Sequence, residues 1–253
     1  MTISRCAFTA LTVALLASGA FANETAHWTY DGETGPANWG KINKEFSQCE
    51  SGRAESPIDV TSAKKAPADM ARVQFRYGPL PLHLLNTGHA MQFVAQPGKD
   101  MLTLGSDQYK LVQFHFHAPG EERFAGKTSP LDMHLVHANA DGKLLVVAVQ
   151  FVTGAPNPVL DAILNQMPSK PGDEETVDAV QIDPSGLLPA KLDYYTYSGS
   201  LTTPPCSEGV TWIELKQPVT IAPRQLEALR KMYNHNQRPA QPLNGREILE
   251  VNP

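Results

Sequence analysis

The sequence predicts a mainly β fold of the α+β class, in which one domain of short strands carries a few short peripheral helices. Proline and glycine, with 21 and 18 copies, recur at close intervals and mark frequent turns. Short apolar runs rich in Phe, Leu and Val lie between these turns, whereas patterns with helical spacing are few. No internal repeat or block of like charges divides the chain, so a single domain is expected.

Strands are expected where apolar residues cluster or alternate between turn signals. The run Leu144–Val152 is apolar almost throughout, which indicates a central strand buried on both faces. Asp141-Gly142 supplies a tight turn before it and predicts a β-hairpin with the preceding strand. The clearest strands are Met91–Ala95, Tyr109–His117, Leu131–Ala138, Leu144–Val152 and Val210–Leu215.

Helices and loops are expected in fewer places. Helices are predicted at Asn157–Met167 and Ala222–Tyr233, where apolar residues recur at helical spacing next to a proline. The proline-rich stretches 78–81 and 168–189 are expected to be surface loops.

The first 22 residues have the pattern of a secretory signal peptide. Arg5 supplies a positive charge, residues 6–18 form an apolar run, and residues 20–22 read Ala-Phe-Ala, a cleavage pattern. A buried N-terminal helix is the alternative. Cleavage after Ala22 leaves residues 23–253 as the folded domain, with no later run apolar enough to span a bilayer.

Charge and cysteine content narrow the classes of partner and site. A formal net charge of −5 without a basic cluster lacks the electrostatic pattern of a nucleic-acid-binding protein. Once Cys6 is lost with the signal peptide, Cys49 and Cys206 remain, and an oxidising compartment favours a disulfide between them. The alternative role, as a metal ligand, lacks a second Cys or a His at the usual zinc spacing.

Three histidines have the pattern of a metal site. His115 and His117 are two residues apart on one predicted strand, so they share a face of the sheet. His134 on the next strand would lie beside them if the two strands pair, about 4.8 Å apart. Three neutral imidazoles with an open fourth position are typical of a catalytic zinc site, whereas a structural site would add a fourth protein ligand. The alternative to a metal site is that His115 and His117 are ordinary polar residues on a solvated strand face.

Two polar residues share the face of these histidines. Gln113 precedes His115 by two positions and Asp132 precedes His134 by two, so each is placed to accept an N–H from an imidazole. His137 points to the opposite face and is expected to be a satisfied core histidine.

Several segments in the same order resemble α-class carbonic anhydrases, in particular the bacterial exported branch. The resemblance covers nearly all of the mature chain, from Trp28 to Arg246. The segments are Gln113–Glu121, Leu131–His137, Tyr197–Pro205, Asn86–His89, Val210–Trp212 and Arg238–Arg246.

The resemblance implies a central, mostly antiparallel twisted sheet with a Zn²⁺ site at the bottom of a conical cleft. It implies His115, His117 and His134 as zinc ligands, with hydroxide in the fourth position attacking CO2 to give bicarbonate and a proton. Thr202 would accept the hydroxide's proton and donate its own to Glu121, which aims the attacking lone pair.

The resemblance also assigns the substrate pocket and the proton exit. His89 would export the proton, because an unperturbed histidine takes and releases protons near neutral pH. CO2 and bicarbonate are the implied small-molecule partners, a homodimer is compatible with the family, and the periplasm is the implied compartment, although a signal peptide alone does not distinguish it from full secretion. The apolar pocket for CO2 would be formed by Val136, Val146, Leu201, Thr203 and Trp212.

Three positions depart from the family pattern. Glu122 stands where His is frequent and is expected to turn outward or to find a cation, because a second buried carboxylate would be unfavourable. Asp132 stands where Glu is frequent, so its contact with His134 is expected to be looser or to pass through water. Glu55 replaces a usual Gln. None removes a zinc ligand.

Two other classes compete with this interpretation. Cupins also carry His-x-His followed by Glu, which His115, His117 and Glu121 imitate, but Tyr109 occupies the place of the upstream glycine that the cupin motif requires. A non-catalytic relative that keeps the fold as a binding module would typically lose a zinc histidine, and here all three are present. A metal assay and a CO2 hydration assay discriminate among the three.

Overall fold

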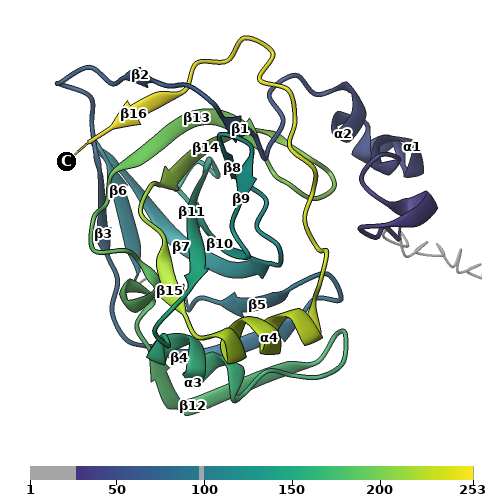
Figure 1. Ribbon diagram of the computed structural model, residues 1–253, viewed down its shortest axis with the longest axis vertical. Coiled ribbons are helices and arrows are strands. Elements are labelled where there is room, and N and C mark those ends of the chain that lie inside the picture. The colour runs from purple at the N-terminus through teal and green to yellow at the C-terminus, as the bar shows by residue number, and fades with distance from the viewer. Residues whose placement is uncertain (1–26, 97–99, 253) are drawn as a thin grey trace, which may run out of the picture.

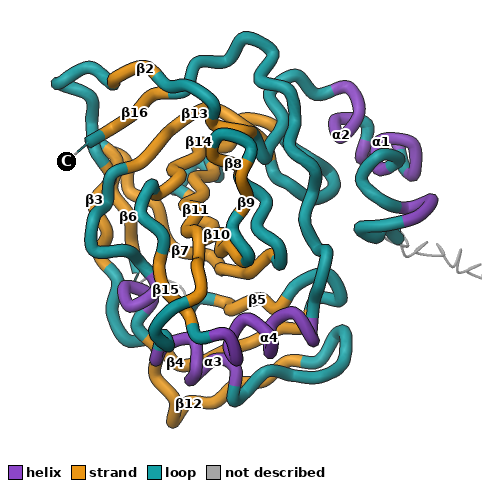
Figure 2. The backbone as a smooth tube through the Cα atoms, in the orientation of Figure 1, coloured by secondary structure: helices purple, strands orange, loops and turns teal. Residues whose placement is uncertain are grey.

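A computed structural model describes residues 27–96 and 100–252 of the chain. Figures 1 and 2 show a large twisted sheet that fills the molecule, with short helices at its periphery. The predicted fold class is therefore confirmed. The proposed signal peptide, residues 1–22, lies outside the described residues. None of the helices in the described ranges is long and apolar enough to cross a membrane.

The main sheet has thirteen strands, and most neighbours are antiparallel. Its order is β12-β4-β5-β7-β10-β11-β14-β13-β16-β2, with β6 joining β7 and β3, and with β15 joining β11. Parallel pairs occur at β11–β14, β11–β15 and β16–β2. The strands of this sheet are β2 Lys64–Lys65, β3 Val73–Arg76, β4 Leu80–Asn86, β5 Met91–Val94, β6 Met101–Leu104, β7 Asp107–His117, β10 Leu131–Ala138, β11 Leu144–Thr153, β12 Glu174–Ile182, β13 Tyr194–Ser200, β14 Glu208–Leu215, β15 Val219–Ile221 and β16 Leu249–Val251.

A second, three-stranded sheet covers one end of the main sheet. It contains β1 Asp59–Val60, β8 Arg123–Phe124 and β9 Lys127–Thr128, in the order β1-β8-β9. Its strands β8 and β9 lie in the connection between β7 and β10. This small sheet therefore fixes the segment that links the strand of His115 and His117 to the strand of His134.

The centre of the main sheet is formed by β7, β10 and β11. Every residue of β10 except the last is buried, and β11 is buried from Leu145 to Val149, as expected for a strand covered on both faces. The connection between them turns at Gly142, whose φ of +77° is a conformation that glycine adopts without strain. The predicted hairpin and central strand are both present.

Apolar side chains form two core clusters. The larger one includes Leu82, Phe93 and Phe114, which are essentially fully buried. The smaller one includes Val136, Val146 and Trp212, three of the pocket residues that the sequence predicted. The side chains of the larger cluster hold the strands of the sheet together, and those of the smaller cluster form a separate apolar surface.

Short helices lie at the periphery, as predicted. Helix α3 begins after Asn157, whose side chain accepts hydrogen bonds from the backbone N–H groups of Val159 and Leu160. This helix is shorter than expected at its C-terminal end, whereas the last helix agrees with its predicted range to within one residue at each end. The α-helices are α1 Trp39–Ile42, α2 Gln48–Ser51, α3 Pro158–Leu164 and α4 Pro223–Met232.

The two predicted surface loops are wrong in part. Stretch 168–189 contains strand β12, which pairs antiparallel with β4 at the edge of the sheet, and a 3-10 helix at Pro184–Leu187. Strand β4 already begins at Leu80, inside stretch 78–81. Because β12 is an edge strand with mostly exposed residues, it lacks the apolar alternation by which a strand is recognised in a sequence.

The structure contains the predicted disulfide. Cys49 at the second position of α2 is bonded to Cys206, 157 residues later. Cys206 is fully buried and follows β13, in the segment that carries Thr202. The bridge therefore ties an N-terminal helix to a candidate catalytic segment.

Candidate metal centre and active site

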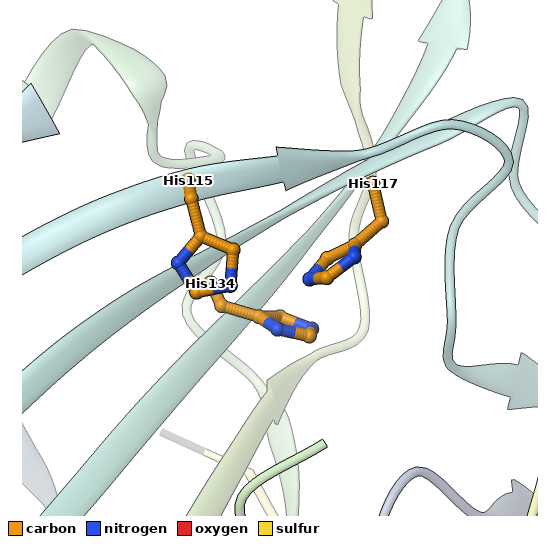
Figure 3. Close-up of side chains that lie close together, drawn as sticks. All are labelled: His115, His117 and His134. Atoms are coloured by element: carbon orange, nitrogen blue, oxygen red, sulfur yellow. The ribbon is translucent and has the colours of Figure 1, made fainter. Parts of the chain in front are cut away.

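Three imidazole rings converge on one face of the central sheet. Strands β7 and β10 pair antiparallel with His115 directly opposite His134 and His117 opposite Asp132. Figure 3 shows the rings of the three histidines turned toward one another. One nitrogen of each lies within 4.8 Å of those of the other two, a spacing at which one metal ion contacts all three.

Hydrogen bonds leave one nitrogen of each ring free to bind a metal. The Nδ1 atom of His115 is 2.8 Å from Oε1 of Gln113, and the Nδ1 atom of His117 is 2.6 Å from the backbone oxygen of Asn236. The Nε2 atoms of both rings are thus available. Nε2 of His117 is buried and has no hydrogen-bond partner among the described residues. An unpartnered buried nitrogen is costly unless a ligand occupies it.

The electrostatics keep these ligands in the metal-binding form. Burial, followed by repulsion from the neighbouring imidazoles, holds the pKa of His115 well below its usual range. The same causes lower the pKa of His117 to about 4. Both rings are therefore neutral at pH 7, which is the form that binds a metal. The donor set of three neutral imidazoles fits Zn²⁺.

The third histidine has a different partner from the one predicted. Nε2 of His134 lies 2.8 Å from Oε1 of Glu122, and 3.8 Å from Oδ2 of Asp132. Asp132 therefore makes only the looser contact with His134 that its short side chain predicts, and its Oδ2 accepts the backbone N–H of Glu121. With Nε2 of His134 engaged, Nδ1 is the nitrogen that faces the other two rings.

The expectation that Glu122 turns outward is also wrong. Its side chain is only 1% exposed and contacts His134. Its carboxyl group lies near that of Asp132. Burial raises the pKa of Glu122 to about 7 and that of Asp132 to about 8, because a charged carboxylate is disfavoured away from water.

Glu121 and Thr202 meet beside the metal centre. Thr202, in the segment after β13, is buried, and its hydroxyl group lies close enough to the Glu121 carboxyl to lower the pKa of that group. The backbone N–H of Arg238 donates a hydrogen bond to Oε1 of Glu121, at 2.6 Å. Burial raises the pKa of Glu121 to about 7, while His134, Arg238 and Thr202 oppose this rise. The fold thus brings together Glu121, Thr202 and Arg238, which lie in three distant segments of the sequence.

An apolar wall lies next to the histidines. The ring centroids of Trp212 and His134 are 4.9 Å apart in an edge-to-face arrangement. Val136 and Val146 are buried in the same cluster, and Leu201 packs against it. The remaining predicted pocket residue, Thr203, is partly buried and adjoins Thr202 in the chain.

His89 lies in an aromatic cluster with Trp28 and Tyr30. Its ring stacks on Trp28, with centroids 3.7 Å apart and planes inclined by 8°. The ring of Tyr30 is 6.5 Å away, edge to face. Burial, and next the neighbouring His27, lower the pKa of the half-buried His89. It is thus held between protein and solvent.

His137 is a core histidine, as the sequence indicates. It is fully buried, with Nε2 2.7 Å from the Tyr77 hydroxyl and Nδ1 3.3 Å from the backbone oxygen of Leu145. Burial lowers its pKa to about 4. Both ring nitrogens are satisfied within the core, so this residue has no share in the metal centre.

A buried ion pair joins Glu55 to Arg238, the residue whose backbone N–H holds Glu121. Arg238 donates from Nη1 to Glu55 at 2.6 Å and to the backbone oxygen of Ser56 at 2.8 Å, and from Nη2 to the backbone oxygen of Cys49. Arg238 and Glu55 are both buried. The glutamate that departs from the family pattern therefore has a charged partner. Sequence reasoning missed this role, as it missed Asn236.

Comparison with known proteins decides the family. The sequence profile of eukaryotic-type carbonic anhydrases matches residues 34–252. A carbonic anhydrase from Pectobacterium carotovorum is 42% identical over 243 residues, which cover 94% of this chain and 98% of that protein. This chain belongs to the eukaryotic-type carbonic anhydrase family. Membership makes it a carbonic anhydrase enzyme, which acts on CO2 and bicarbonate, and excludes the cupin alternative.

Solved carbonic anhydrases have the same fold. The α-carbonic anhydrase of Thermovibrio ammonificans, solved with the inhibitor sulfanilamide, superposes with a TM-score of 0.84 at 43% identity and covers 88% of this chain and 99% of its own. A dioscorin solved with ascorbate superposes with a TM-score of 0.82 at 29% identity, covering 89% of this chain and 98% of its own. The carbonic anhydrase fold thus occurs under more than one name, so the residues of the site must carry the functional argument.

Proposed function

We propose that this carbonic anhydrase is a zinc enzyme that hydrates CO2 reversibly at His115, His117 and His134. The observation that carries the proposal is the convergence of three free imidazole nitrogens, of which Nε2 of His117 is buried without a partner among the described residues. A zinc ion held there would supply a hydroxide nucleophile at neutral pH and leave one position open for it.

Thr202 and Glu121 would orient the nucleophile. An ionised carboxylate only accepts hydrogen bonds, so Glu121 in that form would accept one from the Thr202 hydroxyl group. The Thr202 oxygen is then left as an acceptor for the O–H of the nucleophile, whose lone pair is directed away from it. The adjoining apolar wall of Val136, Val146 and Trp212 would hold CO2 without hydrogen bonds, as suits a nonpolar substrate.

His89 would remove the proton that each hydration releases. It is half-buried at an aromatic cluster and has a ring that can take and release a proton near neutral pH. We also propose that residues 1–22 direct export and that residues 23–253 form the catalytic domain in the periplasm. The Cys49–Cys206 disulfide supports an oxidising compartment.

The test of the proposed function is a joint metal and activity assay on the purified mature chain. One zinc per chain and rapid CO2 hydration are expected, and a chelator should abolish both until zinc is restored. A chain that hydrates CO2 at full rate after complete zinc removal would refute the proposal, and so would a fully zinc-loaded chain without activity.

His89→Ala is expected to lower kcat for CO2 hydration while leaving kcat/KM nearly unchanged. The reason is that kcat/KM reports steps through CO2 conversion, whereas proton export follows them. Stopped-flow assays in weak buffer measure the two parameters, and a small imidazole buffer should restore kcat. His83→Ala is the matched control, because that partly buried ring contacts Glu174 at the sheet edge. Retention of full kcat by His89→Ala would transfer the role to another group.

Thr202→Ala is expected to reduce kcat and kcat/KM together, by about 100-fold, since a misdirected nucleophile affects the chemical step itself. Thr202→Ser retains the hydroxyl group and should keep most of the activity. Both variants are compared with the parent chain at equal zinc content. Equal activities of the alanine and serine variants would show that the hydroxyl group has no orienting role.

A further inference from the structure

We propose that Glu122 is the positioning residue for the metal ligand His134, and that Asp132 acts one step behind it. This inference rests on the zinc site proposed above. It assigns two of the buried carboxyl groups that the proposed reaction leaves without a role, and it replaces the sequence-based expectation that Glu122 turns outward.

The argument begins with the tautomer of His134. Its Nδ1 faces the free nitrogens of His115 and His117, so its proton must reside on Nε2 for it to bind a metal. Oε1 of Glu122, 2.8 Å from Nε2, accepts that proton in a hydrogen bond. Oδ2 of Asp132, at 3.8 Å, is beyond hydrogen-bond range. Glu122 therefore selects the tautomer and fixes the ring plane.

The backbone that carries Glu122 is held tightly in place. A Cβ atom added at Gly120 would lie 2.5 Å from Oγ of Ser129 and 3.1 Å from Oδ2 of Asp132, so the turn after β7 packs directly on the start of β10. Oδ2 of Asp132 also accepts the backbone N–H of Glu121. Asp132 thereby anchors the segment from which both glutamates project.

The two consecutive glutamates serve opposite edges of the His134 ring. Oε2 of Glu121 is 3.9 Å from Nδ1, on the metal-facing side, and Glu122 is hydrogen-bonded to Nε2 on the far side. Substitution of Glu121 should therefore affect turnover, whereas substitution of Glu122 should affect how long the metal is retained.

The decisive measurement is the rate at which zinc is lost to an excess of chelator from the full-length mature chain. Glu122→Ala should lose zinc about 10- to 100-fold faster than the parent chain, the usual cost of removing a residue that orients a metal ligand. Glu122→Gln should lie between the two, because its amide oxygen still accepts the N–H of Nε2 but carries no charge. In the cobalt-substituted forms, the visible absorption spectrum should differ from that of the parent chain most in Glu122→Ala and less in Glu122→Gln.

A relocation variant tests whether the position of the carboxylate is what matters. In Glu122→Ala combined with Asp132→Glu, the extra methylene group lets the carboxylate span the gap of 3.8 Å to Nε2, and zinc retention should partly recover. The matched control is Glu214→Gln, which alters a third carboxyl group that is 1% exposed and lies near Tyr197 and Glu122. Thermal unfolding of the metal-free forms corrects for differences in fold stability.

The outcomes separate this inference from the proposed function. Parent-like zinc retention in Glu122→Ala would overturn the inference, and so would equally fast zinc loss in Glu122→Ala and Glu214→Gln. If the parent chain itself bound no zinc, the proposed function would fail instead. Faster loss in Glu122→Ala alone, with recovery in the relocation variant, is the expected result.

Discussion

His134→Ala is expected to abolish stoichiometric zinc binding and, with it, nearly all CO2 hydration. Removing a residue that merely orients a ligand costs about 10- to 100-fold in metal affinity, so removing the ligand itself should cost more. His115 and His117 alone cannot complete a tetrahedral catalytic site, which needs three protein ligands and an open position. Metal analysis after gel filtration and stopped-flow CO2 hydration give the two readouts.

The control for this variant is His235→Asn. His235 is exposed and has a φ of +62°, a left-handed conformation that asparagine also tolerates. It should keep one zinc per chain and full turnover. Full zinc occupancy with unchanged turnover in His134→Ala would refute the metal assignment, because His134 is the ligand that β10 contributes opposite His115.

Replacing Cys49 and Cys206 together by alanine is expected to lower the free energy of unfolding by roughly 4–5 kcal/mol. The disulfide joins residues 157 apart, and the chain-entropy model assigns a stabilisation of that order to so long a loop. Activity should also fall at temperatures well below the unfolding midpoint, because Cys206 belongs to the segment that presents Thr202. Chemical denaturation of the parent and the variant measures the stability difference.

Two comparisons make the disulfide prediction specific. The parent chain treated with reductant should shift toward the variant, whereas the variant should not respond to reductant. Thiol alkylation followed by mass measurement should find no free thiol in material isolated from its native compartment. Two free thiols in that material, or equal stabilities of parent and variant, would contradict the expectation.

The sequence predicted the histidine triad because strand geometry determines it locally. A His-x-His pair shares one face of β7 by alternation alone, and the pairing of two consecutive strands adds His134. The central strand β11 was equally visible, because burial on both faces leaves an uninterrupted apolar run. By contrast, Glu121 and Thr202 were assigned only by resemblance, since their contact depends on how distant segments meet.

The hydrogen-bond partners of the metal ligands were harder to predict, for two physical reasons. The partner of His117 is the backbone oxygen of Asn236, 119 residues later, and a backbone atom leaves no trace in residue type. The partner of His134 is Glu122, from the connection between β7 and β10, and not Asp132 on its own strand, so it depends on how that connection packs. The two consecutive acidic residues at 121–122 were the available signal in the sequence. The expected free-energy cost of burying both carboxyl groups led to the wrong prediction that Glu122 points outward.

The contacts of the C-terminal segment constrain the order in which the site can be assembled. Figure 1 shows the chain after α4 running along the side of the sheet toward β16 at its far edge. In this segment Asn236 holds His117, and the backbone of Arg238 holds Glu121. A chain that emerges N-terminus first, from a ribosome or a translocation channel, delivers Asn236 119 residues after His117. The candidate ligand His117 is therefore synthesised long before the backbone group that holds its ring, and its orientation is fixed only after the segment that follows α4 has emerged and docked.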